Sequence, residues 1–264
     1  MANSFQKIGS LFTLIIMLGV IAVGCTPPPV AQPSPPPSDE GFTYPVRPGT
    51  EAWARFETHD EMVGATQIPA PVLGQLSSAA LVRAVLDYPL LGDLWAYNSP
   101  NHGVEAVTEQ FNGLQELMQR PDAGRLLLDH YQRLDPNRID PRWSEAEQGH
   151  HSLRIATVEL LLAQPAAQER LSSEAREQLV ATGLATLQAK AGRPTVYGGL
   201  SRQVTAFLVG RTFDALRPGE LQRRVRTPAE VRAFLVDGAF ENTTSAAAQV
   251  VAEVEQVFGP SGER

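Results

Sequence analysis

Residues 104–119 carry the clearest structural pattern in the chain and read Val-Glu-Ala-Val-Thr-Glu-Gln-Phe-Asn-Gly-Leu-Gln-Glu-Leu-Met-Gln. The large apolar side chains of this stretch recur every three or four residues: Val104, Val107, Phe111, Leu114, Leu117 and Met118. Side chains at that spacing share one face of an α-helix, whereas a half-buried strand would place them at every second position. The sequence therefore predicts one amphipathic helix over 104–119.

The same periodicity continues on both sides of this stretch. Capping residues and Pro-containing breaks divide it into further predicted helices. They cover about 58–66, 77–88, 90–97, 122–134, 146–164, 172–189, 200–216, 227–240 and 243–258. No convincing strand alternation and no fixed repeat accompany them, so we predict an all-α fold. Either an irregular helical bundle or a short solenoid of helix pairs would accommodate helices of these lengths.

The first 24 residues have the pattern of a secretory signal peptide. Lys7 is the only charged residue before Asp39, and residues 8–23 are almost wholly apolar. Small residues follow and end at Cys25, the only cysteine of the chain. About 16 apolar residues at 1.5 Å each span roughly 24 Å, short of a ~30 Å hydrocarbon core. A cleaved signal peptide is therefore favoured over an uncleaved membrane helix.

The residues Ala22-Val23-Gly24-Cys25 resemble the lipobox of bacterial lipoproteins, although Ala replaces the more usual Leu at the first position. The resemblance implies cleavage before Cys25, a diacylglyceryl thioether on its sulfur and, in many bacteria, an acyl chain such as palmitate on the new amino group. Two or three acyl chains anchor a protein stably to a membrane. We therefore expect the protein on the extracytoplasmic face of a bacterial cell membrane, with these acyl chains in place of any other cofactor.

A Pro-rich segment follows the cysteine. Residues 26–40 contain seven prolines among fifteen residues, a composition typical of extended polyproline II, which spans up to about 45 Å at ~3.1 Å per residue. A tether is favoured over the alternative, a ligand for an SH3-type domain. The predicted organisation is a signal peptide (1–24), the lipidated cysteine and linker (25–41), one all-helical domain (42–258) and a flexible tail (259–264).

Three stretches, 61–69, 80–90 and 109–117, resemble a helical region of uncharacterised secreted and envelope proteins of bacteria. They begin Glu61-Met-Val-Gly, Ala80-Leu-Val-Arg and Glu109-Gln-Phe-Asn. This resemblance implies the helical class and the envelope compartment. It implies no activity and no catalytic residue.

Composition and missing motifs exclude several classes of function. One cysteine rules out an intrachain disulfide framework, an iron–sulfur cluster and a Cys-rich zinc module. The net charge of −7 argues against a nucleic-acid partner, because neutralising phosphates requires a basic surface. The single lysine after the signal peptide, Lys190, lies in neither a P-loop nor a Ser-x-x-Lys motif. We therefore lean against an enzyme.

One constellation could hold a metal ion. Glu147 and His150 are three residues apart and would share a helical face, with His151 adjacent to them. A metal-assisted envelope enzyme using these three residues is therefore one alternative. The other interpretation is a solvated first helical turn, in which Glu147 complements the helix dipole.

The clearest charge pattern lies in residues 191–236, where eight arginines accompany three acidic residues. Guanidinium groups here could bind an anionic lipid, a wall polymer or an envelope protein. The candidates are Arg217, Arg223, Arg224, Arg226 and Arg232. The alternative, which we favour, is that they pair with acidic residues of the same chain. Our leading hypothesis is a lipid-anchored, non-catalytic binding or interaction protein, and a purely structural envelope protein is a further alternative.

Overall fold

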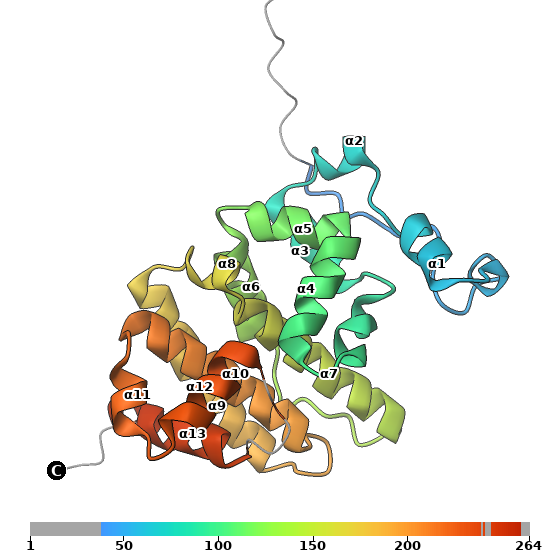
Figure 1. Ribbon diagram of the computed structural model, residues 1–264. Helices are drawn as coiled ribbons and strands as arrows, with labels where there is room; N and C mark the ends of the chain where they lie inside the picture. Colours follow the sequence, from blue (N-terminus) through green and yellow to red (C-terminus); the bar gives the residue numbers. More distant parts are fainter. Residues whose placement is uncertain (1–37, 239, 241–243, 260–264) are drawn as a thin grey trace, which may run out of the picture. The chain divides into compact units, whose positions relative to one another are not determined.

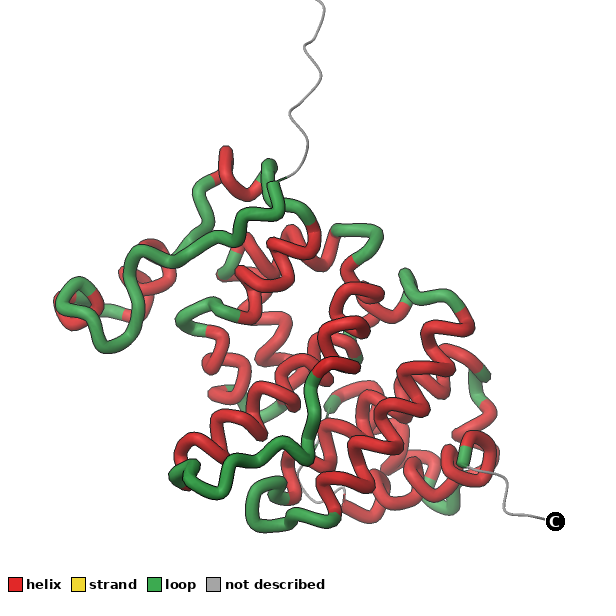
Figure 2. The backbone as a smooth tube through the Cα atoms, turned by 180° about the vertical axis from the view of Figure 1, so that it is seen from behind, coloured by secondary structure: helices red, strands yellow, loops and turns green. Residues whose placement is uncertain are grey.

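The structure is a computed structural model that describes residues 38–238, 240 and 244–259. Within this part of the chain the regular elements are all helical, and a single parallel bridge between Ser38 and Leu76 is the only β-type pairing (Figure 2). The predicted all-α class is thereby confirmed. The predicted signal peptide, Cys25 and most of the Pro-rich linker lie outside the described residues.

The N-terminal half consists of short helices, and the C-terminal half contains the long ones (Figure 1). The first group is η1 (Trp53–Arg55), α1 (His59–Ala65), α2 (Ala70–Leu73), α3 (Ser78–Leu86), η2 (Leu91–Ala96), α4 (Pro100–Gln110), α5 (Asn112–Gln119) and α6 (Ala123–Arg133). The second group is α7 (Glu145–Leu162), α8 (Pro165–Gln168), α9 (Ser173–Ala191), α10 (Gly199–Leu216), α11 (Glu220–Arg224), α12 (Pro228–Asp237) and α13 (Thr244–Phe258).

Serine side chains begin several of these helices. The hydroxyls of Ser77, Ser144 and Ser172 each accept a hydrogen bond from the backbone N–H three residues later. Each satisfies an amide that the first helical turn leaves without a partner, a contribution of about 1 kcal/mol. In the part of the chain that the structure describes, no helix combines the length and the apolar character that crossing a membrane requires.

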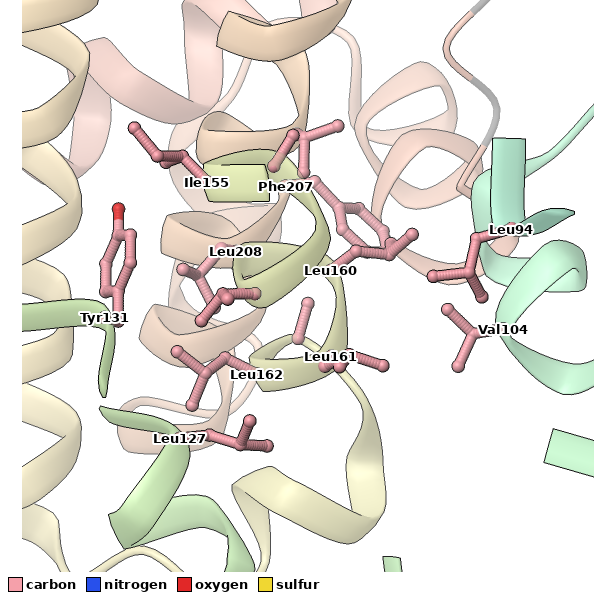
Figure 3. Close-up of a cluster of buried hydrophobic side chains, with 14 of the residues drawn as sticks. Leu94, Val104, Leu127, Tyr131, Ile155, Leu160, Leu161, Leu162, Phe207 and Leu208 are labelled. Atoms are coloured by element: carbon pink, nitrogen blue, oxygen red, sulfur yellow. The ribbon is translucent and has the colours of Figure 1, made fainter. Parts of the chain in front are cut away.

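Helix α10 forms the centre of the C-terminal half. It packs against α7, α9, α12 and α13, and residues 204–210 are all buried, as expected for a helix surrounded by others. Helix α6 packs against both α7 and α3, so the apolar core continues into the N-terminal half. Figure 3 shows this continuity in the side chains of Leu127, Leu162 and Leu208. Contacts among helices distant in sequence favour the irregular bundle over the solenoid.

The single helix predicted over 104–119 is wrong. It is broken at Phe111, whose φ of −117° and ψ of 112° are extended values, so α4 ends at Gln110 and α5 begins at Asn112. The ring of Phe111 is fully buried and stacks on Tyr88, with ring centroids 3.7 Å apart. The apolar spacing runs through the break because α4 and α5 both turn their apolar sides to the same core.

Side chains satisfy the backbone groups around this break. Asn112 Nδ2 donates to the carbonyl of Ile68 at 2.7 Å, and Asn112 Oδ1 accepts from the N–H of Ile68 at 3.1 Å. Gln67 Nε2 donates to the carbonyl of Gln110, while Gln67 Oε1 accepts from the N–H of Asn112. These partners come from about 45 residues upstream, a tertiary arrangement that periodicity cannot reveal.

Smaller differences occur at other elements. The helix predicted over 90–97 is a 3₁₀ helix, and the one predicted over 227–240 ends at Asp237. Gly238 follows with a φ of 61°, a left-handed conformation that glycine adopts without strain and that commonly ends a helix. The short helices α2, α8 and α11 were not expected, because four or five residues are too few to show a period.

Candidate anion-binding pocket

A surface pocket of about 260 Å³ lies between α3, α6 and α7. Its apolar lining comes from Ala79, Val82, Leu86 and Leu126. Its polar lining comes from Arg83, Asp87, His130, Arg133 and Arg154. We call it the arginine pocket, because arginines from three different helices line it.

Helix geometry explains why these side chains converge. On α6, Leu126, His130 and Arg133 follow one another at spacings of four and three, so they share a face. Residues 79, 82, 83 and 86 likewise share one face of α3. Because α6 packs against both α3 and α7, these faces meet Arg154 of α7. No short sequence motif predicts the pocket, since its residues are spread over about 75 positions of the sequence.

Part of this positive charge has a structural explanation. Arg83 and Arg133 lie in the last turns of α3 and α6, where a cation complements the partial negative charge of the helix end. Arg154 lies in the middle of α7, where the helix dipole offers no such benefit. The helix dipole therefore does not explain the presence of Arg154 in the pocket wall.

Few acidic groups balance these arginines. Asp87 is the only carboxylate that lines the pocket. Among the described residues, neither Arg133 nor Arg154 forms a salt bridge. Arg83 is engaged instead by a backbone group, since its Nη2 donates to the carbonyl of Asp39 at 2.7 Å. Arg133 and Arg154 thus line the pocket without a salt bridge to any described carboxylate.

His130 forms a neutral part of the wall. Burial lowers its pKa below the usual 6.5, and the nearby charges of Arg154 and Arg133 lower it further, so the imidazole is uncharged at neutral pH. Its Nε2 is buried and has no hydrogen-bond partner among the described residues. The positive charge of the pocket therefore comes from the arginines, and one polar ring nitrogen is left for a bound molecule or water to satisfy.

The chain segment leading toward the predicted anchor is fastened beside the pocket. Ser38 N donates to the carbonyl of Gln75, and Ser77 Oγ donates to Asp39 Oδ1 at 2.6 Å. Together with the Arg83 contact, these bonds hold residues 38–39 along the start of α3. Residues 38 and 39, which we predict as the end of the linker, thus contact the helical domain.

A second polar cluster is fully buried between α6, α7, α9 and α10. Lys190 Nζ lies 2.8 Å from Glu159 Oε2, and both side chains have no exposed surface. Lys190 also donates to Thr205 Oγ1 and to the carbonyl of Ser201, and the hydroxyl of Tyr131 donates to Glu159 Oε1 at 2.8 Å. Every charge in the cluster is therefore paired and hydrogen-bonded, as burial of ions requires.

Burial sets the proton affinities in this cluster. Loss of water lowers the pKa of Lys190, against the opposing effect of Glu159, and it raises the pKa of Tyr131 well above its usual value, with Glu159 adding to the rise. Without access for a substrate, the arrangement joins helices rather than performing chemistry. Sequence reasoning missed it, although an acid inside the apolar run 155–162 was the available clue.

The five arginines predicted as an anionic-partner site divide into two groups. Arg224 lies 3.0 Å from Glu220 and 3.7 Å from Glu253, and Arg217 lies 3.4 Å from Glu220. The other three are exposed and form no salt bridge with a described residue: Arg223, Arg226 and Arg232. Internal pairing thus occupies two of the five guanidinium groups, and three face solvent.

The three metal-ligand candidates lie near the start of α7. Glu147 Oε2 accepts hydrogen bonds from the N–H and the hydroxyl of Ser144, completing a capping box. His150 is exposed, whereas the ring of His151 is partly buried beside Trp143. Within the described parts of the chain, no three His, Cys, Asp or Glu side chains gather as a metal site would require.

Comparisons of the chain with protein families, with curated proteins and with solved structures gave no match.

Proposed function

We propose that this protein is a lipid-anchored binding protein on the extracytoplasmic face of a bacterial membrane, and that its helical domain binds an anionic ligand in the arginine pocket. The compartment rests on the lipobox-like residues 22–25 and the Pro-rich segment after them. The ligand class rests on the pocket. The observation that carries the proposal is the pair Arg133 and Arg154, which line one pocket and form no salt bridge with any described residue.

The physical argument concerns the cost of keeping like charges together. Guanidinium groups at one site repel each other, and an anion placed between them converts this repulsion into charge-assisted hydrogen bonds. Arg presents a planar fork of donors that matches carboxylate and phosphate oxygens. The remaining described arginines near acidic residues, such as Arg120 with Glu116, are already paired and lack this property.

Ligand binding tests the proposal directly. Isothermal titration of the full-length protein in a neutral detergent with citrate and with inorganic phosphate, at constant ionic strength, should reveal saturable binding. Arg133→Ala/Arg154→Ala should weaken it at least about tenfold, because hydrogen bonds to charged groups contribute about 1.5–3 kcal/mol each. Arg138→Ala/Arg202→Ala, which removes two exposed arginines elsewhere, is the matched control. Absence of binding, or loss only in the control variant, would contradict the pocket assignment.

The anchor is tested separately. Cys25→Ser should move the protein from the membrane fraction to the soluble or unprocessed fraction and should abolish incorporation of labelled palmitate, since the thioether requires the sulfur. Ser34→Ala in the Pro-rich segment is the control and should leave both readouts unchanged. Labelled lipid retained in Cys25→Ser would refute a lipid anchor at this residue.

The geometry supports the alternative of a metal-assisted enzyme less well than it supports an anion-binding protein. The carboxylate of Glu147 already accepts two hydrogen bonds from Ser144 in the helix cap, and these bonds lower the pKa of Glu147. The exposed Arg223, Arg226 and Arg232 stay a predicted second surface for an anionic partner, and Arg223→Ala/Arg226→Ala in the same titration tests it.

A further inference from the structure

The chemistry of the pocket wall narrows the ligand class. We propose that the anion of the arginine pocket is a phosphate monoester attached to an apolar stem, an inference that rests on the proposed binding function. Three features carry it: the number of guanidinium forks, the formal charge of the lining and the apolar residues beside the arginines.

The number of forks favours phosphate over carboxylate. Arginines from three helices line the pocket, and two of them, Arg133 and Arg154, form no salt bridge with a described residue. A carboxylate offers two oxygens, which one planar guanidinium group can occupy, whereas a phosphate monoester offers three strong acceptor oxygens arranged around one atom. A phosphate monoester can therefore accept hydrogen bonds from both guanidinium groups at once.

The formal charge of the lining also favours a phosphate monoester. Three arginines and one aspartate line the pocket, and His130 is neutral. The partial negative ends of α3 and α6 reduce this positive charge without cancelling it. A phosphate monoester carries about −1.5 to −2 at pH 7 and so complements such a wall better than a singly charged carboxylate or sulfate ester does.

The apolar lining predicts that the ligand is more than an inorganic ion. Ala79, Leu86 and Leu126 are only partly buried, and Val82 lies between them on α3. An inorganic phosphate would leave this surface in water. An apolar stem would cover it and remove this apolar surface from water, which favours binding.

Two sources share this chemistry: a water-soluble phosphate ester and a membrane lipid with a phosphate monoester headgroup. The contact between Arg83 and Asp39 places the pocket beside the point where the chain leaves toward Cys25. Twelve residues, 26–37, separate the predicted lipidated cysteine from the segment that contacts Arg83. A headgroup of the anchoring membrane is therefore one candidate source, and a soluble ester is the other.

The test is a comparison of probes by isothermal titration of the full-length protein in neutral maltoside detergent at about pH 8, where phosphate monoesters are doubly charged. Phenyl phosphate should bind at least about tenfold more tightly than benzoate, phenyl sulfate or inorganic phosphate. Arg133→Lys/Arg154→Lys keeps both charges but removes the planar forks, and it should lose most of this preference. Arg138→Lys/Arg202→Lys, at two exposed arginines outside the pocket and outside the predicted second surface, should retain it, and unchanged circular dichroism should confirm that both variants are folded.

The outcomes separate the two proposals. Binding of citrate or benzoate at least as tightly as phenyl phosphate would overturn the phosphate inference and leave anion binding intact, whereas no binding of any probe would overturn both. Equal affinity for inorganic and phenyl phosphate would overturn the apolar stem. Dihexanoyl phosphatidate in place of phenyl phosphate distinguishes the sources: tighter binding supports a lipid headgroup, and weaker binding supports a soluble ester.

Discussion

Lys190 shows how one buried charge can join distant helices. It is the only lysine after the predicted signal peptide, and it lies at 0% exposure against the equally buried Glu159. Its other partners, Ser201 and Thr205, belong to α10, while Glu159 belongs to α7 and Lys190 itself to α9. The ammonium group of Lys190 thus connects α7, α9 and α10 through direct hydrogen bonds.

Removal of one partner of this pair should be costly. We expect Lys190→Met to lower the free energy of unfolding by about 3–5 kcal/mol, because Glu159 would be left charged and unpaired in the core. Lys190→Met/Glu159→Gln should recover at least about 1 kcal/mol of this loss, since glutamine is neutral and still accepts the hydrogen bond of Tyr131. Urea unfolding of the variants measures both effects. A single variant as stable as the wild type would refute the structural role.

At the scale of elements, close approach of helices depends on particular glycines. Helix α4 packs against η2, and a Cβ added to Gly103 would overlap the carbonyl oxygen of Leu94. Gly64 in α1 has open space around its missing side chain. The two glycines look alike in sequence, since both lie inside predicted helical periodicity or next to it. Only packing distinguishes them.

The same substitution should therefore have opposite effects at these two sites. Gly103→Ala should destabilise the protein by about 1–3 kcal/mol, because the backbones of α4 and η2 must separate. Gly64→Ala should stabilise it by up to about 1 kcal/mol, because alanine is the better helix former at an exposed helical position. Thermal unfolding followed by circular dichroism measures the change in midpoint temperature for each variant. Equal shifts of the two midpoints in one direction would contradict the packing argument.

Element boundaries show where periodicity is informative and where it fails. Helices such as α9 and α13 were predicted to within two residues, because they are long and begin at recognisable residues. The break at Phe111 was not predicted, because Gln67 and Asn112 satisfy its backbone groups through contacts between distant segments. A local pattern cannot distinguish a continuous helix from two helices that share one apolar face.

Two partly buried histidines link the stability of the whole molecule to pH. Burial lowers the pKa values of His130 and His151 below 6.5, and the charge of Arg154 lowers both further. Above pH 6.5 both rings are neutral in the folded and the unfolded chain. As the pH falls, the unfolded chain takes up protons first, so stability is lost between pH 6.5 and the lower pKa values of the folded state.

We expect the urea midpoint of unfolding to fall between about pH 7.5 and pH 5, and to fall less in His130→Gln/His151→Gln. The double variant lacks the two imidazoles that take up protons more readily in the unfolded chain than in the folded chain. His150→Gln, at an exposed neighbouring position, should retain the slope of the wild type. If the double variant kept the full slope as well, other groups would be responsible for the pH dependence.

The sequence alone was sufficient to determine the all-α class and most helix positions, because apolar spacing and capping residues act within one turn of their own helix. It also placed the lipobox-like cysteine and the Pro-rich segment, which are local patterns, and on them the proposed location rests. Only the tertiary structure decided which arginines are paired, as Arg224 is, and which share a pocket, as Arg83, Arg133 and Arg154 do. Those properties depend on how helix faces from distant positions meet, and a charge pattern along the chain does not contain that information.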